Sequence, residues 1–124
     1  MNIAVIIAGC RDFSDYEKLK AAADSIIPSE PNNDITIISG HANGADALGE
    51  RYAREHKYNL ELFPANWSLY GKAAGPIRNA KMANRANEFD KGVLVAFWDG
   101  RSRGTKSMID IAIEIGLEVH VIRI

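Results

Sequence analysis

The stretch that decides the fold is Asp34-Ile35-Thr36-Ile37-Ile38-Ser39-Gly40-His41-Ala42-Asn43-Gly44-Ala45-Asp46. Its apolar first part predicts a strand at 34–38, and the helical pattern from about 45 to 56 predicts a helix after the turn. Two glycines permit a sharp turn and a close approach of the backbone to a ligand. Because the first N–H groups of a helix lack partners within it, this turn is a candidate anion site. An ordinary turn capped by Asn43 or Asp46 explains the same residues.

Strand and helix patterns alternate along the remaining chain. Strands are predicted at 3–8, 59–63, 92–98 and 118–124, and helices at 15–27, at 76–89 and from just after Thr105 to about 115. Residues 64–75 read as a loop that is long for a strand-to-helix connection. On the helix at 45–56, Glu50 and Arg54 are spaced to pair with each other, away from the apolar face.

These elements predict an α/β fold, a three-layer, Rossmann-like parallel sheet of five strands with helices on both faces. The strands at 3–8 and 92–98 are apolar throughout and are expected at the centre, whereas those at 59–63 and 118–124 alternate and are expected at the edges. The strand order 3-2-1-4-5 follows, in a single domain spanning residues 1–124. The winding then reverses between the first and fourth strands, and ligands bind beyond the carboxyl ends of the strands at such a point.

Composition argues against several classes of protein. The net charge of −1 is unlike that of a chain built to coat nucleic acid. The single cysteine, Cys10, rules out an internal disulfide framework, and no residues have metal-ligand spacing, so we expect neither a metal nor a cofactor. The start of the chain has no basic leader and its apolar run is too short for a membrane span, so we expect a cytoplasmic protein without a membrane partner.

The loops at the predicted switch point share one chemistry. Glycines allow close backbone approach, cations suit phosphate, aromatic rings suit a base, and hydroxyls suit a sugar or a phosphate. These loops therefore favour a nucleotide-like small molecule as the ligand. The residues are Gly40, Gly44, Gly100 and Gly104; Arg11, Lys72, Arg78, Arg101, Arg103 and Lys106; Phe13, Trp67, Tyr70 and Trp98; and Ser39, Ser102 and Thr105.

Several of these loop residues have plainer explanations. Trp98, at a strand end, suits the core as well as a stacking role. Asp46 suits a helix cap as well as a ribose contact. We interpret Cys10 as a buried filler, and His41 as a loop residue, since no partner for a nucleophilic pair is evident.

Four segments together resemble a known family: GCRDF at 9–13, SGHANGAD at 39–46, GKAAGPIRN at 71–79 and FWDGRSRGT at 97–105. In this order, over nearly the whole chain, they resemble the YspA-like (cpYpsA-related) branch of the SLOG superfamily. Its Rossmann-like domains are related to the DNA-processing protein DprA (Smf) and to the LOG phosphoribohydrolases. The resemblance implies binding of a nucleotide or nucleotide-derived ligand, often in a phage, plasmid or conflict-system setting.

The loops and the resemblance together define the expected ligand-binding residues. They are Gly9, Arg11, Phe13, Ser39, Gly40, Asn43, Gly44, Asp46, Trp67, Lys72, Gly75, Arg78, Asn79, Trp98, Asp99, Gly100, Ser102, Gly104 and Thr105.

One departure from the LOG pattern bears on catalysis. LOG enzymes carry Pro-Gly-Gly-x-Gly-Thr-x-x-Glu, and the resemblance gives its glutamate the catalytic role. In this chain Met108 stands at that position, and Asp110 lies two residues further, about half a helical turn away. Whether the protein is an enzyme is left open, with Asp12, Asp46 and Asp99 as candidate acids.

Three functions fit this sequence. The first is a module that senses or sequesters a nucleotide derivative, and the second is a hydrolase of an N-glycosidic bond. The third is single-stranded DNA binding of the DprA kind, against which the net charge of −1 weighs. The exposed side of the Ala-rich helix at 76–89 offers a face for a second copy, so a homo-oligomer is an additional alternative.

Overall fold

The first strand, β1 (Asn2–Gly9), lies at the centre of the sheet and is buried on both faces. The computed structural model describes residues 1–124, with β1 in parallel pairing to β2 (Asp34–Ser39) and to β4 (Lys91–Trp98). The edge strands are β3 (Asn59–Leu62) and β5 (Glu118–Arg123). The order β3-β2-β1-β4-β5 confirms both the predicted strand order and the Rossmann-like α/β fold.

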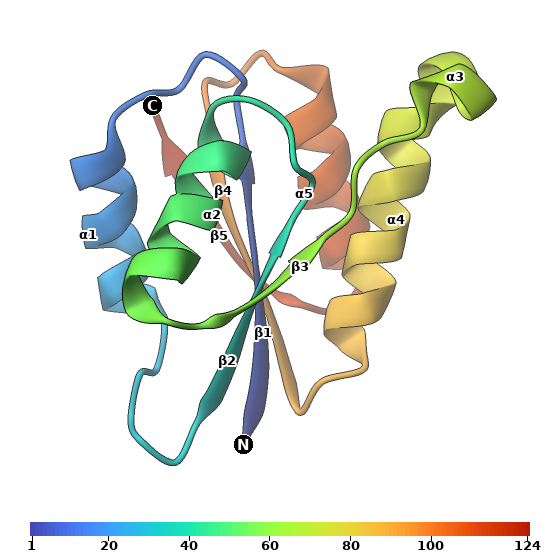
Figure 1. Ribbon diagram of the computed structural model, residues 1–124. Coiled ribbons are helices and arrows are strands. Elements are labelled where there is room, and N and C mark those ends of the chain that lie inside the picture. Colours follow the sequence, from blue (N-terminus) through green and yellow to red (C-terminus); the bar gives the residue numbers. More distant parts are fainter.

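Helices cover both faces of the sheet (Figure 1). On one face lie α1 (Tyr16–Ile26) and α2 (Ala45–His56), and on the other lie α4 (Ala74–Asn87) and α5 (Arg103–Ile115). None of the helices combines the length and the apolar composition that crossing a membrane requires.

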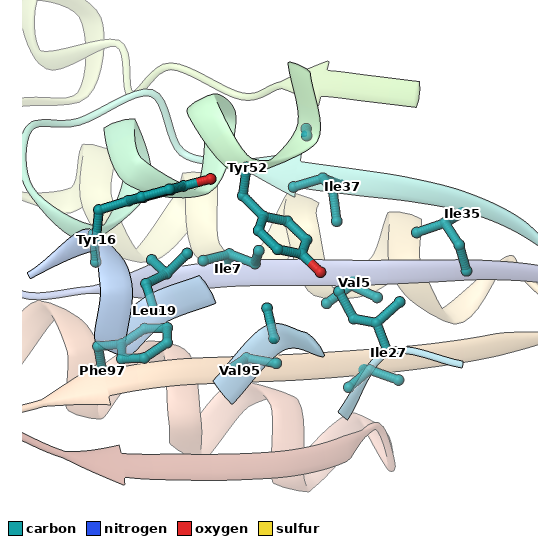
Figure 2. Close-up of a cluster of buried hydrophobic side chains, with 14 of the residues drawn as sticks. Val5, Ile7, Tyr16, Leu19, Ile27, Ile35, Ile37, Tyr52, Val95 and Phe97 are labelled. Carbon is teal, nitrogen blue, oxygen red and sulfur yellow. The ribbon is translucent and has the colours of Figure 1, made fainter. Parts of the chain in front are cut away.

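Alternate side chains of β1 build two separate cores, because successive residues of a strand point to opposite faces. The odd-numbered residues pack against α1 and α2, in the cluster of Figure 2, and the even-numbered residues pack against α4 and α5. Each fully buried Val, Leu or Ile stabilises the fold by roughly 1.5–3 kcal/mol. The apolar run at 3–8 is continuous because both of its faces meet helices.

Capping side chains mark the starts of α1 and α5. Asp15 precedes α1, and its carboxylate accepts a hydrogen bond from the Lys18 N–H at 3.1 Å. Ser102 precedes α5 and accepts from the Thr105 N–H at 3.4 Å. The predicted bounds lie within two residues of the observed ones for the other main elements, but α5 begins at Arg103 and not after Thr105, because Ser102 caps it.

The predicted loop at 64–75 is wrong over most of its length. It contains α3 (Trp67–Tyr70), the 3₁₀ turn η1 (Gly71–Ala73) and the first two residues of α4. Asn66 initiates α3, since its side chain accepts from the Leu69 N–H at 3.1 Å. Pro76 then lies within the first turn of α4, where a missing N–H costs no helical hydrogen bond.

The turn between β2 and α2 depends on Gly44, whose φ is 76°. A Cβ at this position would overlap the carbonyl oxygen of Cys10 and the backbone of Arg11. Without a side chain, the turn comes close enough for the Ala45 N–H to donate to the Cys10 carbonyl at 3.1 Å. The glycine at position 44 therefore permits a contact between two loops of the protein.

Gly44→Ala should lower the free energy of unfolding by about 2 kcal/mol or more, because it combines left-handed strain with steric overlap. Gly104→Ala is the matched control, since a Cβ at this helical position has no neighbouring atom within 4 Å. It should leave stability unchanged or raise it by up to about 1 kcal/mol. Chemical denaturation measures both effects, and a Gly44→Ala protein as stable as the parent would contradict the overlap argument.

Candidate functional site

A cavity of about 450 Å³ opens beyond the carboxyl ends of β1 and β4, and we call it the main pocket. It lies at the switch point of the strand order, bordered by the β1–α1 loop and the starts of α2, α4 and α5. Its volume falls within the range that small-molecule sites occupy. The lining residues are Ala8, Gly9, Cys10, Arg11, Asp12, Ala42, Asp46, Trp67, Arg78, Asn79, Met82, Asp99, Ser102, Gly104, Thr105 and Met108.

Asp46 is the buried carboxylate of the main pocket. It lies in the first turn of α2 and is 5% exposed. Its Oδ2 accepts from the Ala42 N–H at 3.2 Å, and the charges of Arg78 and Arg11 favour its ionised form. Burial outweighs these effects and raises the pKa of Asp46 to about 6. A carboxyl group that titrates near neutral pH is suited to donate or accept a proton.

Arg78 connects α4 to the turn after β2. Its Nη1 donates to the Gly40 carbonyl at 2.7 Å, and its Nε donates to the Asn79 amide oxygen at 2.9 Å. Asn79 in turn donates to the Gly104 carbonyl at 3.3 Å, which reaches the start of α5. A Cβ at Gly40 would overlap the Arg78 guanidinium and lie 2.8 Å from the Asp46 carboxylate, so a glycine at this position admits both groups.

Arg11 and Trp67 form the exposed rim of the main pocket. The guanidinium carbon of Arg11 lies 5.7 Å from the centroid of the Trp67 ring, within cation–π range. Trp67 is 49% exposed and belongs to α3, which projects beyond the amino end of α4 (Figure 1). An indole exposed at a pocket rim is available to stack on a planar group.

The turn between β4 and α5 borders the opposite side of the main pocket. One oxygen of Asp99 accepts the N–H groups of Arg101 and Ser102, each at 2.8 Å. These two hydrogen bonds lower the pKa of Asp99 and hold the turn in shape. Ser102, Gly104 and Thr105 then line the pocket, so the partial positive charge at the start of α5 lies beside it.

A second cavity of about 320 Å³ adjoins the main pocket, and we call it the side pocket. The two pockets share Arg11, Ala42, Trp67 and Arg78 in their linings. The other residues around the side pocket are Gly40, His41, Asn43, Pro64 and Ala65.

Comparisons with known proteins identify the relatives of this chain. The solved C-terminal domain of a hydrogenase from Pyrococcus furiosus superposes with a TM-score of 0.49 at 15% identity, over 98% of this chain and 90% of that one. The Gene 61 protein of Mycobacterium phage D29 is 32% identical over 120 residues, which cover 93% of this chain and 92% of that protein. The model of the YspA, cpYpsA-related SLOG family matches residues 3–70, from β1 through α3.

The chain belongs to the YspA, cpYpsA-related SLOG family. Membership confirms the resemblance seen in the sequence, and it suggests a nucleotide-related binding or processing role. Of the residues that line the main pocket, Arg11, Asp46 and Trp67 lie within the range that the family model matches. Arg78 and the start of α5 lie beyond residue 70.

Met108 occupies the position at which LOG enzymes carry a glutamate. It is 1% exposed and, with Met82 from α4, gives the main pocket a buried apolar lining. The three candidate acids all line the same pocket. Asp99 is engaged in its turn and Asp12 is exposed, so Asp46 is the buried acid among them.

The structure brings most of the predicted ligand-binding residues together around the two pockets. Those in a pocket lining are Gly9, Arg11, Gly40, Asn43, Asp46, Trp67, Arg78, Asn79, Asp99, Ser102, Gly104 and Thr105. Those outside both linings are Phe13, Ser39, Gly44, Lys72, Gly75, Trp98 and Gly100.

Residues outside the linings have structural surroundings of their own. Phe13 is buried and stacks on Phe97 with the ring centroids 5.2 Å apart. The half-buried Trp98 donates its indole N–H to the Ser102 carbonyl at 3.0 Å and so braces the turn before α5. Lys72 is exposed in η1, and Gly75 is buried at the start of α4. Gly100 has a φ of 84° beside the guanidinium of Arg123.

Sequence reasoning missed the burial of Glu50. Its predicted pair with Arg54 exists, at 3.4 Å, yet Glu50 is only 4% exposed. Its Oε2 accepts from the Ser39 hydroxyl at 2.8 Å and lies 2.9 Å from Nδ1 of His41. The spacing of four residues between Asp46 and Glu50, which places both on one helix face, was the signal that could have revealed it.

Asp46→Asn should stabilise the protein at neutral pH and lose this advantage in acid. The carboxyl group releases its proton near pH 3.8 when unfolded and near 6 when folded, so its burial destabilises the folded state increasingly as the pH rises between these values. The stabilising effect of Asp46→Asn on the free energy of unfolding should therefore be about 3 kcal/mol larger well above pH 6 than well below pH 3.8. Equilibrium unfolding at about pH 4 and about pH 7 measures it.

Asp110→Asn is the control for this experiment, because Asp110 is an exposed carboxylate on α5. It should change the pH dependence of stability little. An Asp46→Asn effect of equal size at both pH values would contradict the raised pKa.

Proposed function

We propose that the main pocket binds a nucleotide or a nucleotide-derived ligand. The observation that carries this proposal is that Arg11, Arg78 and the start of α5 border the same cavity as the exposed indole of Trp67. Guanidinium groups and helix N-termini favour phosphate, and an indole favours the flat face of a base. Membership of the SLOG family supports the proposal at the level of nucleotide-related function.

The phosphate is expected between the turn at 40–44 and the first turn of α5, with Arg11 or Arg78 closing the site. Gly40 and Asn43 line the side pocket and Gly104 lines the main pocket, so this position would lie where the two pockets adjoin. Backbone N–H groups would hold much of the negative charge, because the helix start provides them without side-chain entropy cost. The base would then extend toward Trp67 on the rim.

A second candidate function is hydrolysis of an N-glycosidic bond. The buried Asp46 favours it, since this carboxyl group lies in the main pocket and has its pKa raised to about 6. Asp46 would protonate the departing base or take a proton from the attacking water. Met108 in place of the LOG glutamate makes binding without turnover the preferred proposal.

Gly104→Val should weaken nucleotide binding by about tenfold or more, whereas Arg101→Ala should change it less than about fivefold. A Cβ at position 104 would meet no neighbouring atom within 4 Å, so the valine is expected to fill space beside the pocket while the protein still folds. Arg101 is exposed, lies in neither pocket lining, and offers at most one exposed contact of ~1 kcal/mol. Titration calorimetry with AMP, GMP, CMP and UMP measures both. If Arg101→Ala weakened binding more than Gly104→Val, side-chain cations and not backbone N–H groups would be the main contacts of the phosphate.

Nucleoside monophosphates should release free base slowly, about 10²–10⁴-fold below the rate of a LOG phosphoribohydrolase, because a general acid or base contributes that much. Chromatographic detection of adenine released from AMP measures the rate, with a LOG enzyme as reference. Rapid release that Asp46→Asn abolishes would instead establish the hydrolase and give Asp46 its catalytic role.

A further inference from the structure

His41 lies at the edge of the side pocket in a conformation that needs an explanation. It is not a glycine, yet its φ is 59°, in the left-handed region. Its N–H donates to the Ser39 hydroxyl at 3.1 Å, and that hydroxyl donates to Glu50 at 2.8 Å. The same carboxylate oxygen of Glu50 lies 2.9 Å from Nδ1 of His41. Strained backbone held by such a closed set of contacts is typical of functional positions.

The contact with Glu50 determines which ring nitrogen of His41 is available to a ligand. Oε2 of Glu50 already accepts from the Ser39 hydroxyl, so we assign Nδ1 of His41 as a second donor of a hydrogen bond to this oxygen. Nε2, on the opposite side of the ring, has no partner in the protein, and the side chain is 53% exposed. Once protonated at both nitrogens, the ring can donate to Glu50 from Nδ1 and to an anion from Nε2.

The charges around the side pocket favour such an anion. Arg11, Arg78 and His41 line this pocket, and no Asp or Glu does, whereas the lining of the main pocket includes three aspartates. Asp46 lies close to Gly40 and is attracted to both arginines, so one carboxylate offsets part of two guanidinium charges. The carboxylate of Glu50, which contacts His41, is itself paired with Arg54 at 3.4 Å. A surplus of positive charge remains where the two pockets meet.

We infer that the side pocket holds a second phosphoryl group of the ligand, which accepts a hydrogen bond from Nε2 of a protonated His41. Glu50 is the positioning residue that orients the ring. The inference rests on the proposed function, because Arg11 and Arg78, shared by both pockets, place the side pocket next to the expected phosphate. The preferred ligand class is then a nucleotide with two phosphoryl groups, of which a monophosphate would fill only the main-pocket part of the site.

Inorganic pyrophosphate and inorganic phosphate test this inference without a base or a sugar. The parent should bind pyrophosphate at least about tenfold more tightly than phosphate, because the second group gains charge-assisted hydrogen bonds. His41→Asn, which tolerates the left-handed backbone, should remove most of that ratio. His120→Ala removes an imidazole on β5, outside both pocket linings, and should leave the ratio unchanged. Calorimetry measures all three proteins.

The ionisation state of the His41 ring gives a second readout, which a merely structural contact would not move. The charged groups around the ring are Glu50 and Arg54 from α2, Arg11 from the β1–α1 loop and Arg78 from α4. In ¹⁵N NMR spectra at a fixed pH, saturating pyrophosphate should increase the imidazolium fraction of the ring, because an anion at Nε2 favours the charged form. Glu50→Gln should reduce this increase while pyrophosphate still binds.

Three results would overturn the inference: no saturable binding of pyrophosphate, an unchanged ratio in His41→Asn, or a ring that stays neutral at saturation. None of them bears on the main pocket, which the nucleotide titrations with Gly104→Val test separately. Binding of AMP, together with a His41 ring that stays neutral at saturating pyrophosphate, would therefore retain the proposed function and reject the second phosphoryl site.

Discussion

The backbone of Cys10 joins the segments that border the main pocket. Its N–H donates to the Phe97 carbonyl at the end of β4, and its carbonyl accepts from the Ala45 N–H at the start of α2, each at 3.1 Å. One residue thus continues the sheet beyond β1 and fixes the next helix against it. The second of these bonds requires Gly44 in its left-handed conformation, since a side chain there would overlap the Cys10 carbonyl. Arg11 and Asp46 reach the same pocket because they flank this junction.

The sequence predicted the fold well because burial leaves a direct trace in it. Strands covered by helices on both faces read as continuous apolar runs, and edge strands alternate, so the strand order could be deduced. The rim of the site followed from topology, since the carboxyl ends of parallel strands share one edge of the sheet. The segment at 64–75 could not be deduced in the same way, because its helical turns are short, exposed and initiated by the single cap of Asn66.

Side-chain burial near the site was harder to predict than the position of the loops. Glu50 pairs with Arg54 as its spacing suggests, but a contact with Ser39 from β2 decides its burial, and local sequence does not encode that contact. Phe13 illustrates the converse, since an aromatic residue in a ligand-facing loop turns inward onto Phe97. Every buried side-chain polar atom nevertheless has a hydrogen-bond partner, so the buried ionisable groups near the pockets do not carry the cost of an unsatisfied polar group.

The central place of β1 has a consequence for how the protein is made. β1 pairs with β4 from Ile3 opposite Lys91 to Gly9 opposite Phe97, so its second neighbour lies far along the chain. A ribosome that adds about 5–20 residues per second needs roughly 2–7 s to extend the chain from the end of β3 to the end of β4. Throughout that interval the most apolar strand of the molecule has one open edge, which invites pairing with another chain. The order of synthesis therefore leaves the nascent protein vulnerable to aggregation until β4 is available to pair with β1.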